Sequence, residues 1–446
     1  MTSSTPDPDK KSRVIIVDLA VETGLDLAKV EGVVSAFAQH GLVELGHRRR
    51  SAARRSEGAA SVSGMAAPAT RTIPFGRPWL NDDDRKAVAD VLDQPILAHG
   101  PQSAAFEDEF ARFMGDGAHC VSVSSCAAAL HLAYSYFGVG PGDEVIVPAE
   151  THAATANTAE WVGATSVFVD CDDATGNMTA DAIRAAITPR TKAITVVHFV
   201  GIPCDMRPIA ALAREHGIPL VEDCALAVGA RIDGTHVGLF GDVGCFSFYP
   251  VKHITTAEGG MFVSKHADVA SRVARLRAHG VDRSHGERAI PGMYDVPTIG
   301  LNYRLSEIQA ALGRSQLRRI DEILERRRAN FAALKVGLAG APVRVLDGTG
   351  NSHYCLSIVL EGDVASKRND VLRGLGERGV GASVYYPQPV PRMTYYREKY
   401  GYDASSYTGA EDVSDRGIAL PVGPHLEEGD GEAIAAAVRA VVEDAA

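Results

Sequence analysis

The sequence predicts an α/β layer sandwich, in which a mostly parallel β-sheet carries helices on both faces. From Ile73 onward, short runs rich in Val, Ile and Phe recur along the chain, namely HCVSVSS, DEVIVPAE, TSVFVDCD, TKAITVVHF, GIPLVEDCA and GCFSFYP. Several of these runs are bracketed by helical segments such as AAALHLAYSYFG and MTADAIRAAI. This alternation is typical of a parallel sheet buried between layers of helices. The length of 446 residues also exceeds that of one ordinary domain, so we expect a second, smaller unit.

The composition narrows the class of protein and its compartment. Apolar residues make up 46% and charged residues 23% of the chain, and the formal net charge is -11. These values are typical of a mildly acidic globular protein and argue against general affinity for nucleic acid. The seven cysteines are scattered without CxxC pairs, which favours reduced thiols over a disulfide framework or a zinc site. Because we find neither a signal-peptide core nor an apolar run of about 20 residues, we expect a cytoplasmic protein without membrane spans.

The first 46 residues differ in character from the rest of the chain. Apolar residues at helical spacing flank ETGLD, and the segment ends in LVEL, which resembles a helix-turn-helix. Residues 47–72 are small, polar and dotted with arginine, so we interpret them as a flexible linker. The extension either contacts DNA or docks on a protein surface. The second interpretation is favoured because acid repels phosphate, and the part that would face DNA carries Asp18, Glu22, Asp26 and Glu31.

The remaining chain divides into two predicted domains. Residues 73–320 contain the apolar runs and are expected to form a large domain. Past Arg304 the pattern turns helical, LSEIQAALGRSQLRRIDEILERRRANFAALKVGL, and this stretch leads into residues 321–446. There, strand-like segments such as HYCLSIVLEG mix with helical ones such as GEAIAAAVRAVVE, as in a small α+β unit.

Polar side chains near the carboxyl ends of the predicted strands mark the expected ligand site, because ligands of open parallel sheets bind at that edge. Ser124 and Ser125 follow the first run and directly precede a helix, whose free amides and positive dipole end favour a phosphate. Asp223 closes the run GIPLVED. Ser247 lies in GCFSFYP as a further phosphate-ligand candidate, and Lys252 follows that run.

A phosphate site, a semi-buried acid and a single lysine together match the needs of pyridoxal 5'-phosphate. Lys252 would form a Schiff base with the aldehyde, and partial burial would lower the pKa of its amine and supply the neutral nucleophile. Asp223 would keep the pyridine nitrogen protonated, which makes the ring an electron sink. Once displaced by a substrate amine, Lys252 would move a proton as general base and then acid. Both residues are therefore predicted to be catalytic.

At these positions the sequence resembles the pyridoxal-phosphate-dependent sugar aminotransferases of the DegT family, which act on nucleotide-linked keto-sugars or ketocyclitols. The resemblance runs from about Ile73 to the C-terminus and rests on collinear motifs such as AHGPQSAAFEDEFARFMG, GPGDEVIVPAETHAATANT, VEDCALAVGA, FSFYPVKHITTAEGGM and LNYRLSEIQAALGRSQLRRIDEILERRR. It implies the type I aminotransferase fold and a homodimer with shared active sites. It also implies that Asn302 reaches the cofactor phosphate of the neighbouring subunit and that His152 stacks on the pyridine ring.

The sequence departs from the family pattern at five positions. Cys126 and Ala127 stand where relatives usually have Gly-Thr, so this part of the cofactor-binding turn lacks a hydroxyl and leaves more of the phosphate cradle to the preceding serines. Leu226 replaces a Gln or His near the cofactor's phenolic oxygen. Tyr385 and Gly423 each replace a histidine in the region that meets the sugar or its nucleotide. These departures indicate an acceptor other than a common nucleotide-sugar.

The leading functional prediction is transamination. Glutamate or glutamine would give its amino group, by way of the cofactor, to a ketone on a sugar or cyclitol in amino-sugar, antibiotic or other secondary-metabolite biosynthesis. One alternative is a dehydratase of keto-deoxysugars, but that related subgroup has histidine in place of the lysine, so Lys252 argues against it. The other alternative is a transcription regulator that senses a metabolite through the cofactor and binds DNA with the N-terminal extension.

Overall fold

The computed structural model describes residues 71–446 with the exception of residues 116, 283–289 and 291. The chain divides into two units, Met1–Ala67 and Pro68–Ala446, and all described residues belong to the second. The predicted helix-turn-helix extension (1–46) and nearly all of the predicted linker (47–72) therefore lie outside the described residues.

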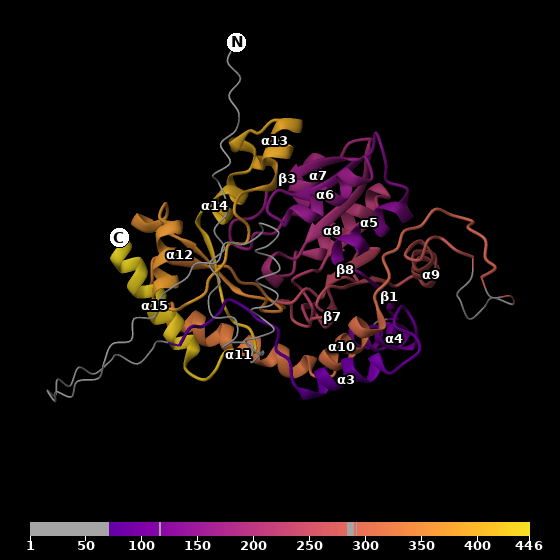
Figure 1. The fold of residues 1–446 in the computed structure, drawn as a ribbon. Coiled ribbons are helices and arrows are strands. Elements are labelled where there is room, and N and C mark those ends of the chain that lie inside the picture. Colours follow the sequence, from indigo (N-terminus) through magenta and orange to yellow (C-terminus); the bar gives the residue numbers. More distant parts are fainter. Residues whose placement is uncertain (1–70, 116, 283–289, 291) are drawn as a thin grey trace, which may run out of the picture. The chain divides into compact units, whose positions relative to one another are not determined.

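Seven strands form the central sheet (Figure 1). In spatial order they are β1 (His119–Val123), β9 (Gly260–Ser264), β8 (Val243–Ser247), β5 (Leu220–Asp223), β4 (Thr191–Val197), β2 (Glu144–Pro148) and β3 (Thr165–Val169). Within this sheet β9 runs antiparallel to both of its neighbours, and the other six strands share one direction. Five of these six strands lie within a predicted apolar run, and β8 begins one residue before the sixth run, which confirms the predicted α/β sandwich. The sequence did not predict β9.

Helices cover both faces of the central sheet. Side chains alternate between the two faces along each strand, so apolar side chains on both faces pack against helices. Val145 and Val147 of β2 face one helical layer, whereas Ile146 between them faces the other. The first layer consists of α5 (Cys126–Phe137), α6 (Ala153–Trp161) and α9 (Ala267–Leu276). The second layer includes α7 (Ala180–Ala186) and α8 (Met206–His216). Three further helices are α3 (Asp82–Leu92), α4 (Pro101–Met114) and α10 (Glu307–Leu317).

A second sheet is antiparallel and lies later in the sequence. Its strands are β10 (Val343–Val345), β11 (Leu356–Leu360) and β12 (Gly417–Leu420). The helices that pack on it are α11 (Ile320–Gly337), α12 (Arg368–Glu377) and α15 (Asp430–Ala445). The predicted boundary at residue 320 falls at the first residue of α11, and the division into large and small domains stays a prediction.

The described part of the second unit is completed by short elements. These are the hairpin β6 (Arg231–Ile232) and β7 (Thr235–His236), the helices α13 (Thr394–Tyr400) and α14 (Thr408–Arg416), and the 3-10 turns η1 (Phe199–Gly201), η3 (Gly362–Val364), η4 (Val390–Arg392) and η5 (Ala404–Ser406). Among the helices of residues 71–446 that the structure describes, none combines the length and apolar character needed to cross a membrane.

Candidate active site

The predicted site residues gather near one edge of the central sheet. Asp223 is the last residue of β5 and Ser247 the last of β8, while Ser124 and Ser125 follow the end of β1. Lys252 lies five positions beyond Ser247. Because these strands run parallel, their carboxyl ends meet at the same edge, as expected for the ligand site of an open α/β sheet.

The carboxylate of Asp223 is buried and held by donors from other segments. Thr155, in the first turn of α6, donates its hydroxyl to Oδ2 at 2.9 Å, and the backbone amide of Ala225 donates to Oδ1 at 3.1 Å. The thiol of Cys126, the first residue of α5, lies 3.6 Å from Oδ1 and 3.4 Å from the carbonyl oxygen of Cys245. A buried carboxylate needs such partners to offset the loss of hydration. These contacts fix the direction of the carboxylate.

The amine of Lys252 is buried and lies next to an aromatic ring. Its Nζ atom lies 4.9 Å from the centroid of the Tyr354 ring. Burial lowers the pKa of Lys252 to about 8, while nearby Cys126 and Asp223 act in the opposite direction. No carboxylate within the described ranges forms an ion pair with Nζ. The lysine is therefore available as a neutral nucleophile at mildly alkaline pH.

The start of α5 leaves backbone donors free for a phosphate. The Ser125 hydroxyl oxygen accepts the amide of Ala128 at 3.0 Å and so caps the helix. The amides of Cys126 and Ala127 have no acceptor among the residues that the structure describes, which is usual for a first helical turn. The Ser124 amide, by contrast, donates to the carbonyl oxygen of Tyr303 at 2.9 Å. The Ser125 O–H can still donate outward.

A glycine allows this helix start to approach the sheet. A Cβ atom added to Gly260 of β9 would lie 2.5 Å from the carbonyl carbon of Ser125 and 2.7 Å from the amide nitrogen of Cys126. Ser247 also lies next to this glycine, because the two residues are paired between the neighbouring strands β8 and β9. Its side chain is buried, and its Oγ accepts the amide of Tyr249 at 3.4 Å. The phosphate candidates on α5 and β8 therefore flank the same glycine.

His152 and Asn302 have different surroundings. His152 is the N-cap of α6, and its Nδ1 accepts the amide of Ala154 at 3.1 Å. Its ring centroid lies 5.4 Å from that of Tyr386, at an angle of 74°, and burial lowers its pKa. Asn302 is exposed, and its backbone forms an isolated bridge with Ala278. Their predicted contacts with the cofactor stay predictions.

Three positions that depart from the family pattern have defined surroundings. Leu226 is buried in an apolar cluster, and it offers its carbonyl oxygen to the Ser352 hydroxyl at 2.9 Å. The hydroxyl of Tyr385 lies 2.7 Å from that of Tyr354. Gly423 lies beside His425, because a Cβ atom at that glycine would be 2.6 Å from the Nδ1 of the histidine.

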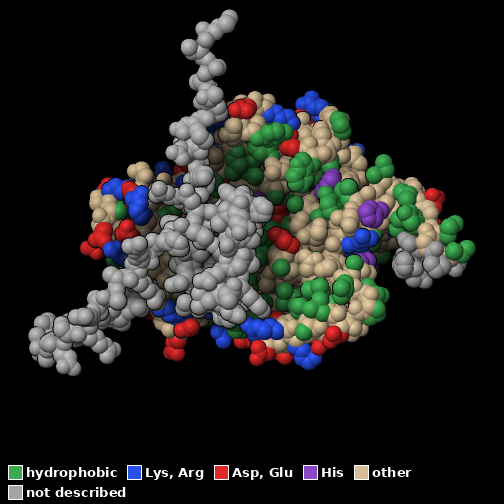
Figure 2. All heavy atoms as spheres, viewed as in Figure 1, with side chains coloured by type: hydrophobic (Ala, Val, Ile, Leu, Met, Phe, Trp, Pro, Cys, Tyr) green, Lys and Arg blue, Asp and Glu red, His purple; other side chains and the backbone are tan. Residues whose placement is uncertain are grey.

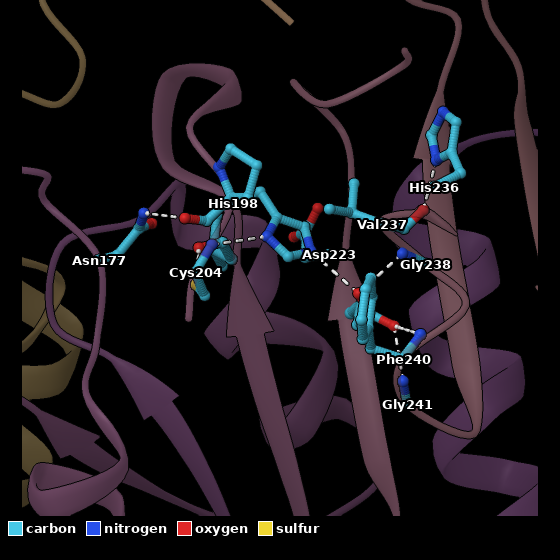
Figure 3. A network of polar contacts seen from close by, with 12 residues as sticks. Asn177, His198, Cys204, Asp223, His236, Val237, Gly238, Phe240 and Gly241 are labelled. Atoms are coloured by element: carbon cyan, nitrogen blue, oxygen red, sulfur yellow. Dashed lines mark hydrogen bonds and ion pairs between the residues drawn. The ribbon is translucent and has the colours of Figure 1, made fainter. Parts of the chain in front are cut away.

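A polar network ties the residue before Asp223 to a neighbouring loop (Figure 3). His198, Glu222 and Cys224 offer ligand atoms within 4.8 Å of one another. The Glu222 carboxylate, however, already accepts the amides of Gly238, Phe240 and Gly241, and it contacts His198 Nε2 at 3.0 Å. The other imidazole nitrogen accepts the Cys204 amide at 3.1 Å. We interpret this network as a structural support for the end of β5.

The arrangement suits a pyridine aldehyde with a phosphate. Free amides at the start of α5 suit the phosphate, the fixed carboxylate suits a protonated ring nitrogen, and the amine with a lowered pKa suits the aldehyde. Fold and site thus define a pyridoxal 5'-phosphate-dependent enzyme of the aminotransferase class. Two contacts were not foreseen from the sequence. They are the hydrogen bond from the Thr155 hydroxyl to Asp223 and that from the Arg327 guanidinium to the carbonyl oxygen of Lys252 at 3.4 Å. Neither the motif ETHAATANT nor the run of arginines gives a signal for them.

Comparison with known proteins gives the family. Residues 78–439 match the DegT/DnrJ/EryC1/StrS aminotransferase family, and the chain belongs to that family. It is 35% identical over 382 residues to the spore coat polysaccharide biosynthesis protein SpsC of Bacillus subtilis, covering 84% of this chain and 98% of that protein. It is 37% identical over 365 residues to a UDP-N-acetyl-3-dehydro-alpha-D-glucosamine 3-aminotransferase of Acidithiobacillus ferrooxidans, covering 81% and 94%.

Solved structures agree with this assignment. PseC of Helicobacter pylori, an aminotransferase in the biosynthesis of pseudoaminic acid, superposes with a TM-score of 0.79 at 28% identity, covering 84% of this chain and 100% of that one. The predicted family, type I aminotransferase fold, pyridoxal phosphate cofactor and aminotransferase activity are confirmed. The comparisons give no support to the transcription regulator or the dehydratase.

We predict that the hydroxyl of Thr155 contributes to cofactor binding through Asp223. Thr155→Val keeps the shape but removes a hydrogen bond to a charged group, worth about 1.5–3 kcal/mol, so the affinity for pyridoxal phosphate should fall about tenfold or more. The measurement is an absorbance titration of the cofactor. Thr158→Val is the matched control, because that hydroxyl donates to the carbonyl oxygen of Thr155 and not to Asp223. Equal affinities of the two variants would contradict the prediction.

The pKa of Lys252 predicts how cofactor attachment depends on pH. Only the neutral amine attacks an aldehyde, and the neutral fraction grows as the pH rises through about 8. We therefore expect the rate of attachment of pyridoxal phosphate to cofactor-free protein to increase with pH and level off above that value. Stopped-flow absorbance measures this rate. An inflection near about 10.4, the ordinary lysine value, would show that the amine is fully hydrated.

Proposed function

We propose that the protein transfers an amino group from glutamate or glutamine to a ketone on a sugar or cyclitol. The observation that carries the proposal is the convergence of the Asp223 carboxylate and the Lys252 amine beside free helix-start amides. The relatives support the acceptor class, since one is named for a 3-dehydro amino sugar linked to UDP and another for polysaccharide biosynthesis. Biosynthesis of an amino sugar or a related secondary metabolite would use such a product.

Each site residue receives a role from its surroundings. When bound, pyridoxal phosphate supplies an electron sink for the carbon that carries the amine. Asp223, held by Thr155, would pair with the protonated ring nitrogen. Lys252 accepts a proton from the substrate carbon as a neutral amine and then returns it. The amides of Cys126 and Ala127 bind the phosphate.

The side chain next to the lysine supports aminotransfer over dehydration. His253 is fully enclosed, and its Nε2 donates to the carbonyl oxygen of Ser352 at 3.0 Å. Burial holds the pKa of His253 well below its usual value. The neighbours that shift the pKa of Lys252 include Asp223, whereas those of His253 are Arg327, Ser352, Lys252 and His353. The lysine, and not the histidine, therefore shares the site with the acid.

The surroundings of the lysine support an acceptor that differs from those of most relatives. Tyr385 offers a phenol bonded to that of Tyr354 where a histidine is frequent. Leu226 offers an apolar side chain where Gln or His is usual. Acceptor recognition at these two positions therefore rests on phenol hydroxyls and apolar contact, and an imidazole or carboxamide takes no part there.

We propose that the active enzyme is a homodimer. The segment just before Asn302 exposes a series of large apolar side chains, among them Ile299, which is 91% exposed. The others are Ile290, Met293, Tyr294, Val296 and Leu301. This segment extends away from α9 in Figure 1, and apolar side chains lie beside the grey residues in Figure 2. Such an apolar surface is typical of protein contacts, and a second copy of the chain would cover it and receive Asn302.

The remaining organisation is proposed as the sequence predicted it. The extension (1–46) docks on a protein and does not bind DNA, the linker spans 47–72, and the two domains span 73–320 and 321–446. A cytoplasmic location is supported by the seven cysteines, all of which are free thiols.

The experiment that tests the function removes the lysine. Lys252→Ala should lose the near-visible absorbance of bound cofactor and amino transfer from glutamate or glutamine, because Lys252 supplies the amine that attaches the aldehyde. Lys265→Ala, which changes an exposed lysine after β9, should keep both and is the control. Turnover by Lys252→Ala at the rate of the control would refute the assignment.

A further inference from the structure

Arg327 is a buried cation without an acidic partner. It is 4% exposed and lies on α11. Its guanidinium donates to the carbonyl oxygen of Tyr354 at 2.8 Å and to that of Lys252 at 3.4 Å. No Asp or Glu pairs with it in the part of the chain that the structure describes, and its Nε has no hydrogen-bond partner there. Burial lowers the pKa of Arg327 only to about 10, so the group remains charged at neutral pH.

Two backbone carbonyls do not neutralise such a charge. An unpaired buried ion is among the most unfavourable groups in a protein interior. A structural arginine can be satisfied by carbonyl dipoles, but here one donor stays unused. The molecule therefore gains from a bound anion at this position.

A hollow next to Arg327 offers the place for that anion. Its wall includes the exposed Arg77, the buried His425, Gly423 and the residue before the lysine, Val251. All its charged lining residues are basic, and none is acidic. The enclosed part has room for about one water molecule. That space admits one oxygen atom of an anion, so the rest of a bound carboxylate would lie in the open part of the hollow.

The hollow is one side chain away from the reacting amine, because Tyr354 lines the hollow and also lies next to Lys252. The ring of Tyr354 lies 4.9 Å from Lys252 Nζ and 5.9 Å from the Cζ atom of Arg327. The same guanidinium contacts the main chain of the lysine. A carboxylate held at Arg327 would therefore lie beside Tyr354, the residue whose ring is also next to the reacting amine. In amino transfer, the reactant that always carries a carboxylate is the amino-acid donor.

We propose that Arg327, with Arg77 at the mouth of the hollow, forms a carboxylate subsite for the amino donor. This inference rests on the proposed aminotransferase function and adds to it a donor-binding residue. The same chemistry would also accept a carboxylate on an acidic sugar acceptor, and the experiment separates these two sources. Gly423 keeps the hollow open, because a Cβ atom there would lie 2.6 Å from His425 and 3.9 Å from an Arg327 nitrogen.

The test is a calorimetric titration in which glutarate is added to the cofactor-loaded enzyme. Glutarate has the carboxylates of glutamate but no reactive amine. Wild type should bind glutarate, and Arg327→Gln should bind it about tenfold more weakly or worse, since a charge-assisted contact is lost. Arg328→Gln is the matched control, because that neighbour on α11 is exposed and paired with Glu325. It should bind as wild type does.

A second variant guards against a structural effect of Arg327 on the lysine segment. Arg77 is exposed, and its side chain forms no hydrogen bond with the residues that the structure describes. Arg77→Gln should therefore keep the fold and still weaken glutarate binding by about threefold. If Arg327→Gln does not fold, this variant decides. The subsite would be overturned if Arg77→Gln, and Arg327→Gln where it folds, bound glutarate as tightly as the wild type does. It would also be overturned if the wild type did not bind glutarate at millimolar concentration.

Two further outcomes separate the inference from the function on which it rests. Galacturonate, a sugar acid, is titrated in parallel. Arginine-dependent binding of galacturonate without binding of glutarate would overturn the donor assignment and make the acceptor the source of the carboxylate. Arginine-dependent glutarate binding in a protein that transfers no amino group would uphold the subsite and contradict the proposed function.

Discussion

The site depends on the fixed carboxylate of Asp223. A buried carboxylate must be hydrogen-bonded, and here the donors are Thr155 and the amide of Ala225. The residue before it, Glu222, is fixed through the amides of the 238–241 loop. Two successive acids at the end of one strand therefore have different tasks. Glu222 holds the strand end in place, and Asp223 has the position that the proposed pairing with a cationic ring nitrogen requires.

A second constraint is that two basic side chains, Lys252 and Arg327, lie close together near this edge of the sheet. Lys252 must lose its charge to react, and burial favours this. Arg327 cannot lose its charge, and it lies against the same aromatic ring. Its charge helps to depress the pKa of the lysine. An anion bound at the arginine would weaken that effect, so the proposed donor binding would raise the pKa of the lysine.

How much the sequence predicts follows from which interactions are local. The six parallel strands coincide with runs rich in apolar residues, whereas β9 begins at Gly260 and has only three consecutive apolar residues, Met261 to Val263. Asp223 and Lys252 stand out because the first ends a buried strand and the second follows one. Arg327 does not, because Arg326 and Arg328 on either side have the same side chain and only the fold buries the middle one. The sequence does not predict the role of Thr155 either, because its hydrogen-bond partner Asp223 lies 68 positions away.

The account is tested most directly at the ring nitrogen of the cofactor. The measurement is the nitrogen chemical shift of isotopically labelled pyridoxal phosphate bound to the wild type and to Asp223→Asn. We predict a protonated pyridine nitrogen in the wild type and an unprotonated one in the variant, because an amide cannot stabilise the cation as a carboxylate does. An unprotonated nitrogen in the wild type, or the same shift in both proteins, would contradict the role that the structure gives to this carboxylate.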